Sequence, residues 1–141
     1  MATVELRFSA QPEHVRTARL VAAAVARRAG VEEALLDEVR LAVGEACSRA
    51  VGLHRGNAVT APVRVVLTDE EKVFSIEVGD EAPGGPAGPA GTGPAGDSDA
   101  AEDDMGLAVI SGLVDDYEVT SGEAGGVIRM SWPVAGAPGL P

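Results

Sequence analysis

Three short segments of the 141-residue chain have residue types and spacings that could support chemistry. In the first, the carboxylate of Glu45 lies four residues before the guanidinium of Arg49. A carboxylate can act as a general base, but this spacing also suits a surface ion pair on a helix. The second begins at Asp80, which follows an apolar run and could equally cap a turn. The third is residues 104–107, where Gly106 could simply start a helix or could open a helix whose free N–H groups bind an anion.

The other reactive side chains do not assemble a second site. Cys47 is the single cysteine, which excludes an internal disulfide, and its place beside an apolar stripe predicts a small buried side chain. His14 and His54 have no partner at a suitable spacing, so we expect both to be solvated. Because the sequence has no Cys/His cluster, it predicts no metal ligands.

Charge and hydropathy narrow the classes of partner. The chain has 22 acidic and 11 basic residues and a formal net charge of -11. Phosphate backbones and anionic membranes favour basic proteins, so we expect no direct contact with nucleic acid or with a membrane surface. The longest apolar run, residues 20–26, is far shorter than the roughly 20 residues of a membrane span, and residues 1–10 lack a signal-peptide pattern. These features predict a cytoplasmic protein.

Composition also bears on the core and on the source of the gene. Aromatic residues make up only 3% of the chain, so Ala, Val and Leu must build the core. The basic residues are Arg except for Lys72, and Ala, Gly and Pro are abundant. This usage indicates a GC-rich genome, as in actinomycetes.

The N-terminal half predicts one strand followed by two helices. Residues 3–10 alternate apolar and polar side chains, which is typical of a half-buried strand. Pro12 suits a first helical turn and Gly30 a left-handed stop, so a helix is expected over residues 12–29 and a second over about 31–56. The expected buried stripes are Val15, Ala18, Leu20, Ala22 and Val25 in the first helix, and Leu35, Val39, Ala42, Val43, Ala46, Ala50 and Leu53 in the second.

The C-terminal half predicts two pairs of strands separated by a loop and a short helix. In chain order we expect a strand over 63–68, a polar turn over 69–72, a strand over 73–78, a helix over 105–116, strands over 117–120 and 127–134 joined by a turn, and a frayed tail over 135–141. Segregated helices and mostly antiparallel strands predict an α+β two-layer sandwich, with helices on one face of the sheet and a single domain over residues 1–134.

Residues 81–104 interrupt this order with a biased composition. The 14 residues from Pro83 to Gly96 comprise six Gly, four Pro, three Ala and one Thr, which cannot build a core. Asp97 to Asp104 then supplies five acids among eight residues. We expect a disordered loop, which is either an acidic binding element that orders on a partner or a solvated insertion without a role.

Taken in order, the three segments resemble the ATP-binding boxes of the GHKL superfamily, and most closely those of the bacterial anti-sigma-factor serine kinases. The family's first box is Glu-Ala-x-x-Asn on a helix, and residues 45–49 have Glu-Ala-Cys-Ser-Arg. The second is Asp-x-Gly-x-Gly after a strand, and residues 80–84 have Asp-Glu-Ala-Pro-Gly. The third is Gly-x-Gly-Leu/Phe at a helix start, and residues 104–107 have Asp-Met-Gly-Leu. The resemblance extends from the first strand to Trp132.

The resemblance implies the GHKL (Bergerat-type) ATPase fold, with residues 81–104 as a lid over ATP. It also implies that Glu45 acts as a general base on a target serine hydroxyl and that Asp80 accepts a hydrogen bond from the adenine amino group. The positions implied to contact the nucleotide are Arg49, Asp80, Ala82, Gly84, Met105, Gly106 and Leu107.

Three positions depart from the family pattern. Arg49 replaces the Asn whose side-chain oxygen holds Mg²⁺, and a guanidinium has only donors and a positive charge, so it cannot hold the metal. It would instead pair with Glu45 or contact phosphate directly. Ala82 replaces a Gly of the second box, and Asp104 replaces a Gly of the third. We interpret the site as a degenerate one for ATP or ADP, in which Mg²⁺ has lost its ligand.

The expected function is that of an anti-sigma regulatory factor in a bacterial partner-switching system. Its partners would be a sigma factor and a STAS-type anti-anti-sigma protein, its serine kinase activity would be weak or lost, and the resemblance also implies a homodimer. Two alternatives stay open: an active ATP-dependent serine kinase acting on the anti-anti-sigma partner, and a non-catalytic interaction module that uses the acidic loop. A self-contained histidine kinase is disfavoured because no second domain with a phospho-accepting His is expected.

Overall fold

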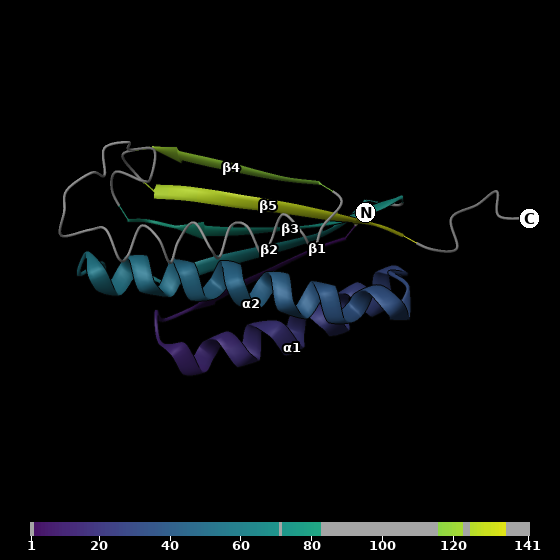
Figure 1. Ribbon diagram of the computed structural model, residues 1–141, viewed down its shortest axis with the longest axis horizontal. Coiled ribbons are helices and arrows are strands. Elements are labelled where there is room, and N and C mark those ends of the chain that lie inside the picture. Colours follow the sequence, from purple (N-terminus) through teal and green to yellow (C-terminus); the bar gives the residue numbers. More distant parts are fainter. Residues whose placement is uncertain (1, 71, 83–115, 123–124, 135–141) are drawn as a thin grey trace, which may run out of the picture.

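A computed structural model of the chain describes residues 2–70, 72–82, 116–122 and 125–134 (Figure 1). Two helices and five strands lie within these ranges. In chain order they are β1 (Ala2–Phe8), α1 (Pro12–Ala29), α2 (Glu33–Gly56), β2 (Val63–Glu70), β3 (Val73–Asp80), β4 (Asp116–Gly122) and β5 (Gly125–Pro133). The predicted loop over 81–104, beyond its first two residues, the helix over 105–116, up to residue 115, and the tail over 135–141 lie outside the described residues.

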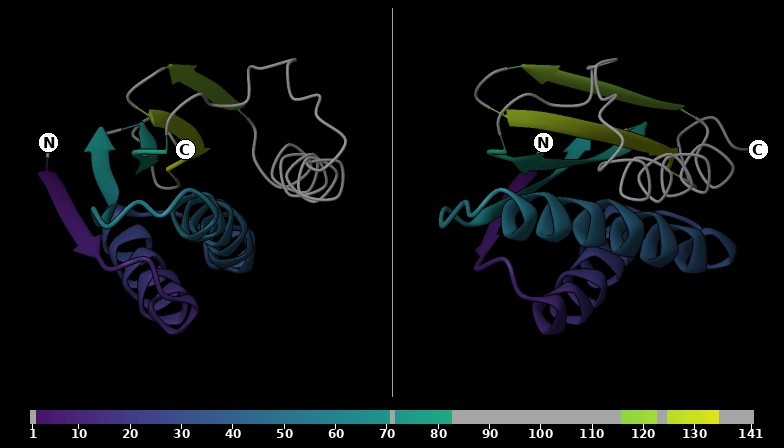
Figure 2. Two further views of the ribbon diagram at one scale, coloured as in Figure 1. Left: turned by 90° about the vertical axis from the view of Figure 1, so that its left-hand side faces the viewer. Right: turned by 60° about the vertical axis from the view of Figure 1, so that its left-hand side comes forward.

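The five strands form one sheet in the order β1-β2-β3-β5-β4, and every neighbouring pair is antiparallel. Figure 2 shows α1 and α2 side by side in a second layer on one face of this sheet. The predicted α+β two-layer sandwich, with helices covering one face of an antiparallel sheet, is therefore confirmed.

Side chains alternate between the two faces of the sheet, as period-two strands require. On β2, β3 and β5 the buried helix-facing side chains are apolar except for Asp80, and the apolar ones are Val63, Val65, Leu67, Phe74, Ile76, Val78, Ile128, Met130 and Trp132. Phe74 and Trp132, two of the largest buried side chains, stand opposite each other in the β3–β5 register. Asp80 continues the inward alternation of β3, so its carboxylate lies on the same side of the sheet as the helices.

The ends of α1 follow the sequence signals closely. Pro12 is its first residue, and Gly30 ends it in the left-handed conformation with φ 103°. The backbone N–H groups of Gly30 and Val31 donate to Arg27 and Ala26, which satisfies two of the last carbonyl groups. Leu20, however, is 57% exposed, so its predicted place on the buried stripe is wrong. Ala22 is buried as predicted, and Ala23 and Ala26 join it, because small side chains let the two helices pack closely.

α2 is the central helix of the packed layer. Its buried residues include Leu36, Val39, Ala42, Val43, Ala46, Cys47, Ala50, Val51 and His54, so the stripe passes through His54 rather than Leu53. The prediction that His54 is solvated is wrong, because its side chain is 0% exposed. The prediction for Cys47 is confirmed, since this thiol is also 0% exposed. At Gly44 an added Cβ would lie 2.8 Å from Cδ of Arg19 on α1, a flexible and exposed side chain that can move aside, so helix packing does not by itself require glycine here.

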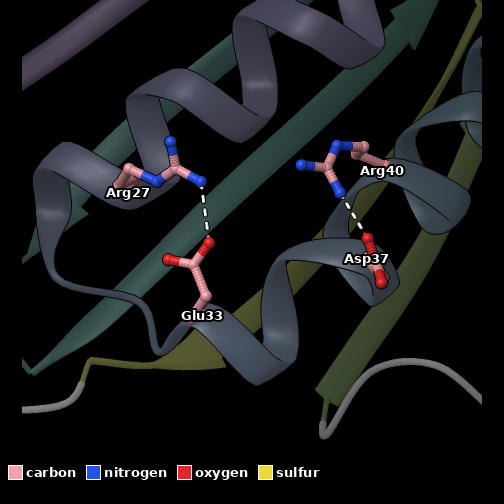
Figure 3. Close-up of polar contacts among 4 residues, drawn as sticks. All are labelled: Arg27, Glu33, Asp37 and Arg40. Carbon is pink, nitrogen blue, oxygen red and sulfur yellow. Dashed lines mark hydrogen bonds and ion pairs between the residues drawn. The ribbon is translucent and has the colours of Figure 1, made fainter.

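Two exposed ion pairs lie at and near the connection between the helices (Figure 3). Arg27, in the last turn of α1, donates to Glu33 at the start of α2 over 2.8 Å. Arg40 pairs with Asp37 one turn away on α2. Solvated pairs of this kind contribute little stability, so they guide the connection more than they hold the fold.

β2 and β3 form the expected hairpin with a shorter turn than predicted. β2 continues to Glu70 and β3 begins at Val73, so Asp69 and Glu70 are paired strand residues and not part of the turn. Asp69 also stands opposite Ala2 of β1. Pairing of Asp69 with both neighbouring strands, and of Glu70 with β3, extends β2 through these acidic residues, an effect that local composition does not reveal.

Candidate functional site

Glu45 and Arg49 lie one turn apart on α2, and both side chains are half-buried. Among the residues that the structure describes, neither makes a hydrogen bond or an ion pair, so the predicted Glu45–Arg49 pair is not formed. The Nε atom of Arg49 is buried and has no hydrogen-bond partner in this part of the chain. A buried donor without a partner costs about 1–3 kcal/mol, so the site favours an acceptor there.

Asp80 ends β3 on the helix-facing side of the sheet and is only 9% exposed. One carboxylate oxygen, Oδ1, accepts a hydrogen bond of 2.9 Å from the backbone N–H of Ala82, whose side chain is 2% exposed. This short turn fixes the orientation of the carboxylate. No hydrogen bond to the other oxygen occurs among the described residues, so that oxygen can accept from a ligand.

The start of β5 presses directly on this turn. Gly126 stands opposite Asp80 in the register, and Gly125 has φ +133°. A Cβ on Gly125 would lie only 2.0 Å from the carbonyl oxygen of Asp80. Only glycine fits here, since both the backbone conformation and the close approach exclude a side chain.

His54 joins α2 to the segment after β3. Its Nε2 lies 2.8 Å from the backbone nitrogen of Glu81, and its Nδ1 lies 3.0 Å from the carbonyl oxygen of Ala61. Sequence reasoning missed this residue because it treated His as solvated. The available signal was position, since His54 follows Ala50 by one helical turn on the buried stripe.

Cys47 lies on the same helix but does not add a reactive group. Burial raises the pKa of its thiol to about 12. A thiol that stays protonated at neutral pH is a poor nucleophile. Cys47 therefore serves the core between Ala46 and Ala50 and takes no part in chemistry.

A hollow lies on the outer face of the sheet, which is the face away from the helices. Its volume is about 350 Å³, and its lining includes Arg7, Arg64, Gly79, Glu81 and Gly126. Arg7 and Arg64 face each other across β1 and β2. Asp80 belongs to the lining of this hollow as well as to the candidate site, and sequence reasoning did not anticipate the hollow.

The structure places four of the eight predicted site residues, namely Glu45, Arg49, Asp80 and Ala82. It ties the two segments that carry them together through the hydrogen bond between Glu81 and His54. Gly84, Met105, Gly106 and Leu107 lie outside the described residues. Within the described ranges, no group of three or more His, Cys, Asp or Glu side chains could hold a metal ion.

The chemistry of these residues can be compared with that of the adenine, the phosphates and the Mg²⁺ ion of bound ATP. The oriented, mostly buried carboxylate of Asp80 suits an amino-group donor such as adenine. The buried, unpartnered Nε of Arg49 suits an acceptor oxygen such as that of a phosphate. Mg²⁺ does not fit at Arg49, because a guanidinium offers no oxygen ligand and repels the cation.

Comparison with known proteins identifies the domain. The sequence pattern of the histidine kinase-like ATPase domain matches residues 8–132. The chain belongs to the histidine kinase-like ATPase domain family. The resemblance to GHKL ATPases drawn from the three boxes is thereby confirmed.

Similar structures support the same fold. The crystal structure of the RsbU and RsbW domains of Rv1364c from Mycobacterium tuberculosis is similar, with a TM-score of 0.70 and 16% sequence identity. The match covers 95% of this chain but only 32% of that one, so the chain spans about a third of that protein's length. A comparison with curated proteins gave no match. Neither α1 nor α2 has the apolar length that a membrane crossing needs.

Proposed function

We propose that this histidine kinase-like ATPase domain is an anti-sigma regulatory factor that binds ATP or ADP without a metal ligand from α2. The observation that carries the proposal is the buried, unpartnered Nε of Arg49, at the position where the family pattern has a metal-binding Asn. Asp80 supplies a carboxylate for the adenine amino group at the end of β3. The site then retains purine recognition and loses its Mg²⁺ ligand.

Electrostatics supports direct binding of phosphate by Arg49. A guanidinium is always charged and presents several donors in a fixed plane, so it can replace part of the charge that a cation would provide. The nucleotide would also satisfy the Nε donor that the described residues leave unpaired. Binding should therefore persist when Mg²⁺ is removed.

Isothermal titration calorimetry with ATP and ADP in EDTA tests the nucleotide site. We expect the native protein to bind nucleotide and Asp80→Asn to bind it at least tenfold more weakly. The substitution removes the negative charge of the carboxylate that would accept a hydrogen bond from the adenine amino group. Glu77→Gln is the matched control: it makes the same change on the same strand, but on the outer face of the sheet. Equal affinity of Asp80→Asn and the native protein would refute the role of Asp80.

Kinase activity is the second candidate function, and Glu45 is the reason to test it. Its carboxylate is half-buried and makes no ion pair with Arg49, so it remains able to accept a proton as a general base. We expect weak or no transfer from labelled ATP and Mg²⁺ to a STAS-type partner, because the metal has no ligand at Arg49. Strong transfer that Glu45→Ala abolishes, and Glu38→Ala on the same helix does not, would contradict the degenerate site and establish a kinase.

Regulation by partner switching requires two protein partners. The proposal names a sigma factor and a STAS-type anti-anti-sigma protein, on the strength of the family resemblance. Co-purification of each with the tagged chain, in ATP and in ADP, tests whether the nucleotide changes the choice of partner. Binding of neither partner would refute the regulatory role while leaving the nucleotide site intact.

The acidic loop offers a contrasting explanation for partner binding. Residues 83–103 lie outside the described part of the chain. Deleting them separates the two explanations: unchanged partner affinity supports the domain surface, whereas loss of binding with unchanged nucleotide affinity supports an interaction module.

A further inference from the structure

The imidazole of His54 bridges three parts of the chain from a fully buried position. It projects from the last turn of α2 and is 0% exposed. Its two ring nitrogens contact backbone groups that follow α2 and β3, namely the carbonyl of Ala61 at 3.0 Å and the nitrogen of Glu81 at 2.8 Å. The backbone carbonyl of His54 also accepts from the N–H of Val59 at 2.8 Å, so the loop after α2 is tied to the same residue.

Backbone chemistry fixes the state of this ring. A backbone N–H can only donate and a backbone carbonyl can only accept. Nε2 must therefore present its lone pair to Glu81, and Nδ1 must carry the proton donated to Ala61. His54 is thus neutral in the Nδ1–H tautomer, with both ring nitrogens satisfied, which accounts for the burial of a polar side chain.

The hydrogen bond to Glu81 lies within the turn that orients Asp80. Glu81 sits between Asp80 and Ala82, and the N–H of Ala82 holds Oδ1 of Asp80 at 2.9 Å. Fixing the nitrogen of Glu81 therefore fixes the path of the chain between the carboxylate and the amide that orients it. Through His54, α2 thereby sets the position of Asp80, and His54 itself need not contact a ligand.

We propose that His54 is a positioning residue that sets the Asp80 carboxylate for nucleotide binding, an assignment that rests on the proposed nucleotide site. Its hydrogen bond to Glu81 transmits the position of α2, which carries Glu45 and Arg49, to the end of β3. One acceptor atom thereby links the two halves of the site, beside the packing of α2 on the sheet.

Two substitutions separate the hydrogen bonds of the ring. In His54→Gln, the side-chain oxygen can take the place of Nε2 and still accept from Glu81. In His54→Asn, the side-chain amide can take the place of Nδ1 and donate to Ala61, but it is too short to reach Glu81. We expect His54→Asn to weaken ATP binding by roughly tenfold, the value of one lost hydrogen bond, and His54→Gln to remain within about threefold of the native affinity.

Amide NMR gives a readout that does not depend on nucleotide. In the native protein the ring ¹⁵N shifts should report a protonated Nδ1 and a bare Nε2. The amide signals of Glu81 and Ala82 should shift and lose protection from exchange in His54→Asn, and should be retained in His54→Gln. An Nε2–H tautomer, or equal loss of both amide signals in the two variants, would overturn the proposal, as would native ATP affinity in a folded His54→Asn.

Failure of the proposed function gives a different pattern. If the native protein binds no nucleotide in calorimetry while the NMR pattern is as expected, the nucleotide site is refuted. The effect of His54 on the turn that orients Asp80 is then still tested by the Ala82 amide signal in the two variants. If the native protein binds ATP and both variants bind it equally well, the nucleotide site stands and the role of His54 is refuted.

Discussion

The start of β5 should be the least tolerant glycine position in the described chain. Gly125 has φ +133°, and a Cβ there would meet the carbonyl oxygen of Asp80 at 2.0 Å. A residue forced into such a conformation costs about 1–3 kcal/mol. Relief of the clash must also separate Gly126 from Asp80 in the ladder, which loses a further backbone interaction of about 1 kcal/mol. We expect Gly125→Ala to lower the free energy of unfolding by about 2–4 kcal/mol.

Gly52 provides a matched control with the opposite sign. It lies exposed in the interior of α2, and an added Cβ would meet nothing within 4 Å. Because Ala is the better helix former, Gly52→Ala should raise the free energy of unfolding by about 0.5–1 kcal/mol. The same glycine-to-alanine change therefore tests steric fit at one site and backbone entropy at the other.

Urea unfolding followed by tryptophan fluorescence measures both effects. Trp132 is the single tryptophan and is 2% exposed, so its emission reports loss of the core. With an m value of about 2 kcal/mol per M, Gly125→Ala should lower the midpoint by about 1–2 M and Gly52→Ala should raise it slightly. A Gly125→Ala midpoint within 0.5 M of the native value, or shifts of the same sign in both variants, would refute the packing of β5 on Asp80.

Three further predictions follow from burial and exposure. Burial raises the pKa of Cys47 from 9.0 to about 12, so between these pH values the thiol ionises in the unfolded chain but not in the native protein. The free energy of unfolding should therefore fall by up to about 1.4 kcal/mol per pH unit as pH rises from 9 towards 12. In urea titrations, Cys47→Ala should remove this contribution to the pH dependence of stability. In a double-mutant cycle, Arg27→Gln and Glu33→Gln should show a coupling energy below about 1 kcal/mol because their side chains are 60% and 76% exposed, and a coupling above 2 kcal/mol would contradict that assignment. Trp132→Ala should cost about 3–5 kcal/mol by calorimetric unfolding, whereas a loss under 1 kcal/mol would show that the β3–β5 core is not packed as described.

Local signals predicted much of the fold. Pro12 and Gly30 bound α1 as expected, because a fixed φ suits a helix start and a positive φ suits a helix end. The strands expected over 63–68 and 73–78 both formed, within β2 and β3. The continuation of β2 through Glu70 depends on pairing with β3, and at Asp69 also with β1, and no local pattern contains that information.

The site was predictable in position but not in detail. Asp80 could be selected because it is a carboxylate at the end of an apolar strand, where it can cap a turn or face a ligand. The unpartnered Nε of Arg49 and the close approach of Gly125 to Asp80 arise from packing between distant segments. His54 was assigned to solvent because a polar side chain usually is exposed, and its partners, Ala61 and Glu81, are 7 and 27 residues away.

The dependence of ATP affinity on Mg²⁺, compared between the native protein and Arg49→Asn, tests the central claim most directly. The native protein should bind ATP equally well in EDTA and in Mg²⁺, whereas Arg49→Asn restores an oxygen ligand and should bind ATP only, or at least tenfold more tightly, with Mg²⁺. Arg55→Asn, the same change at an exposed position in the last turn of α2, should behave like the native protein. Strong Mg²⁺ dependence in the native protein, with none gained by Arg49→Asn, would contradict the account.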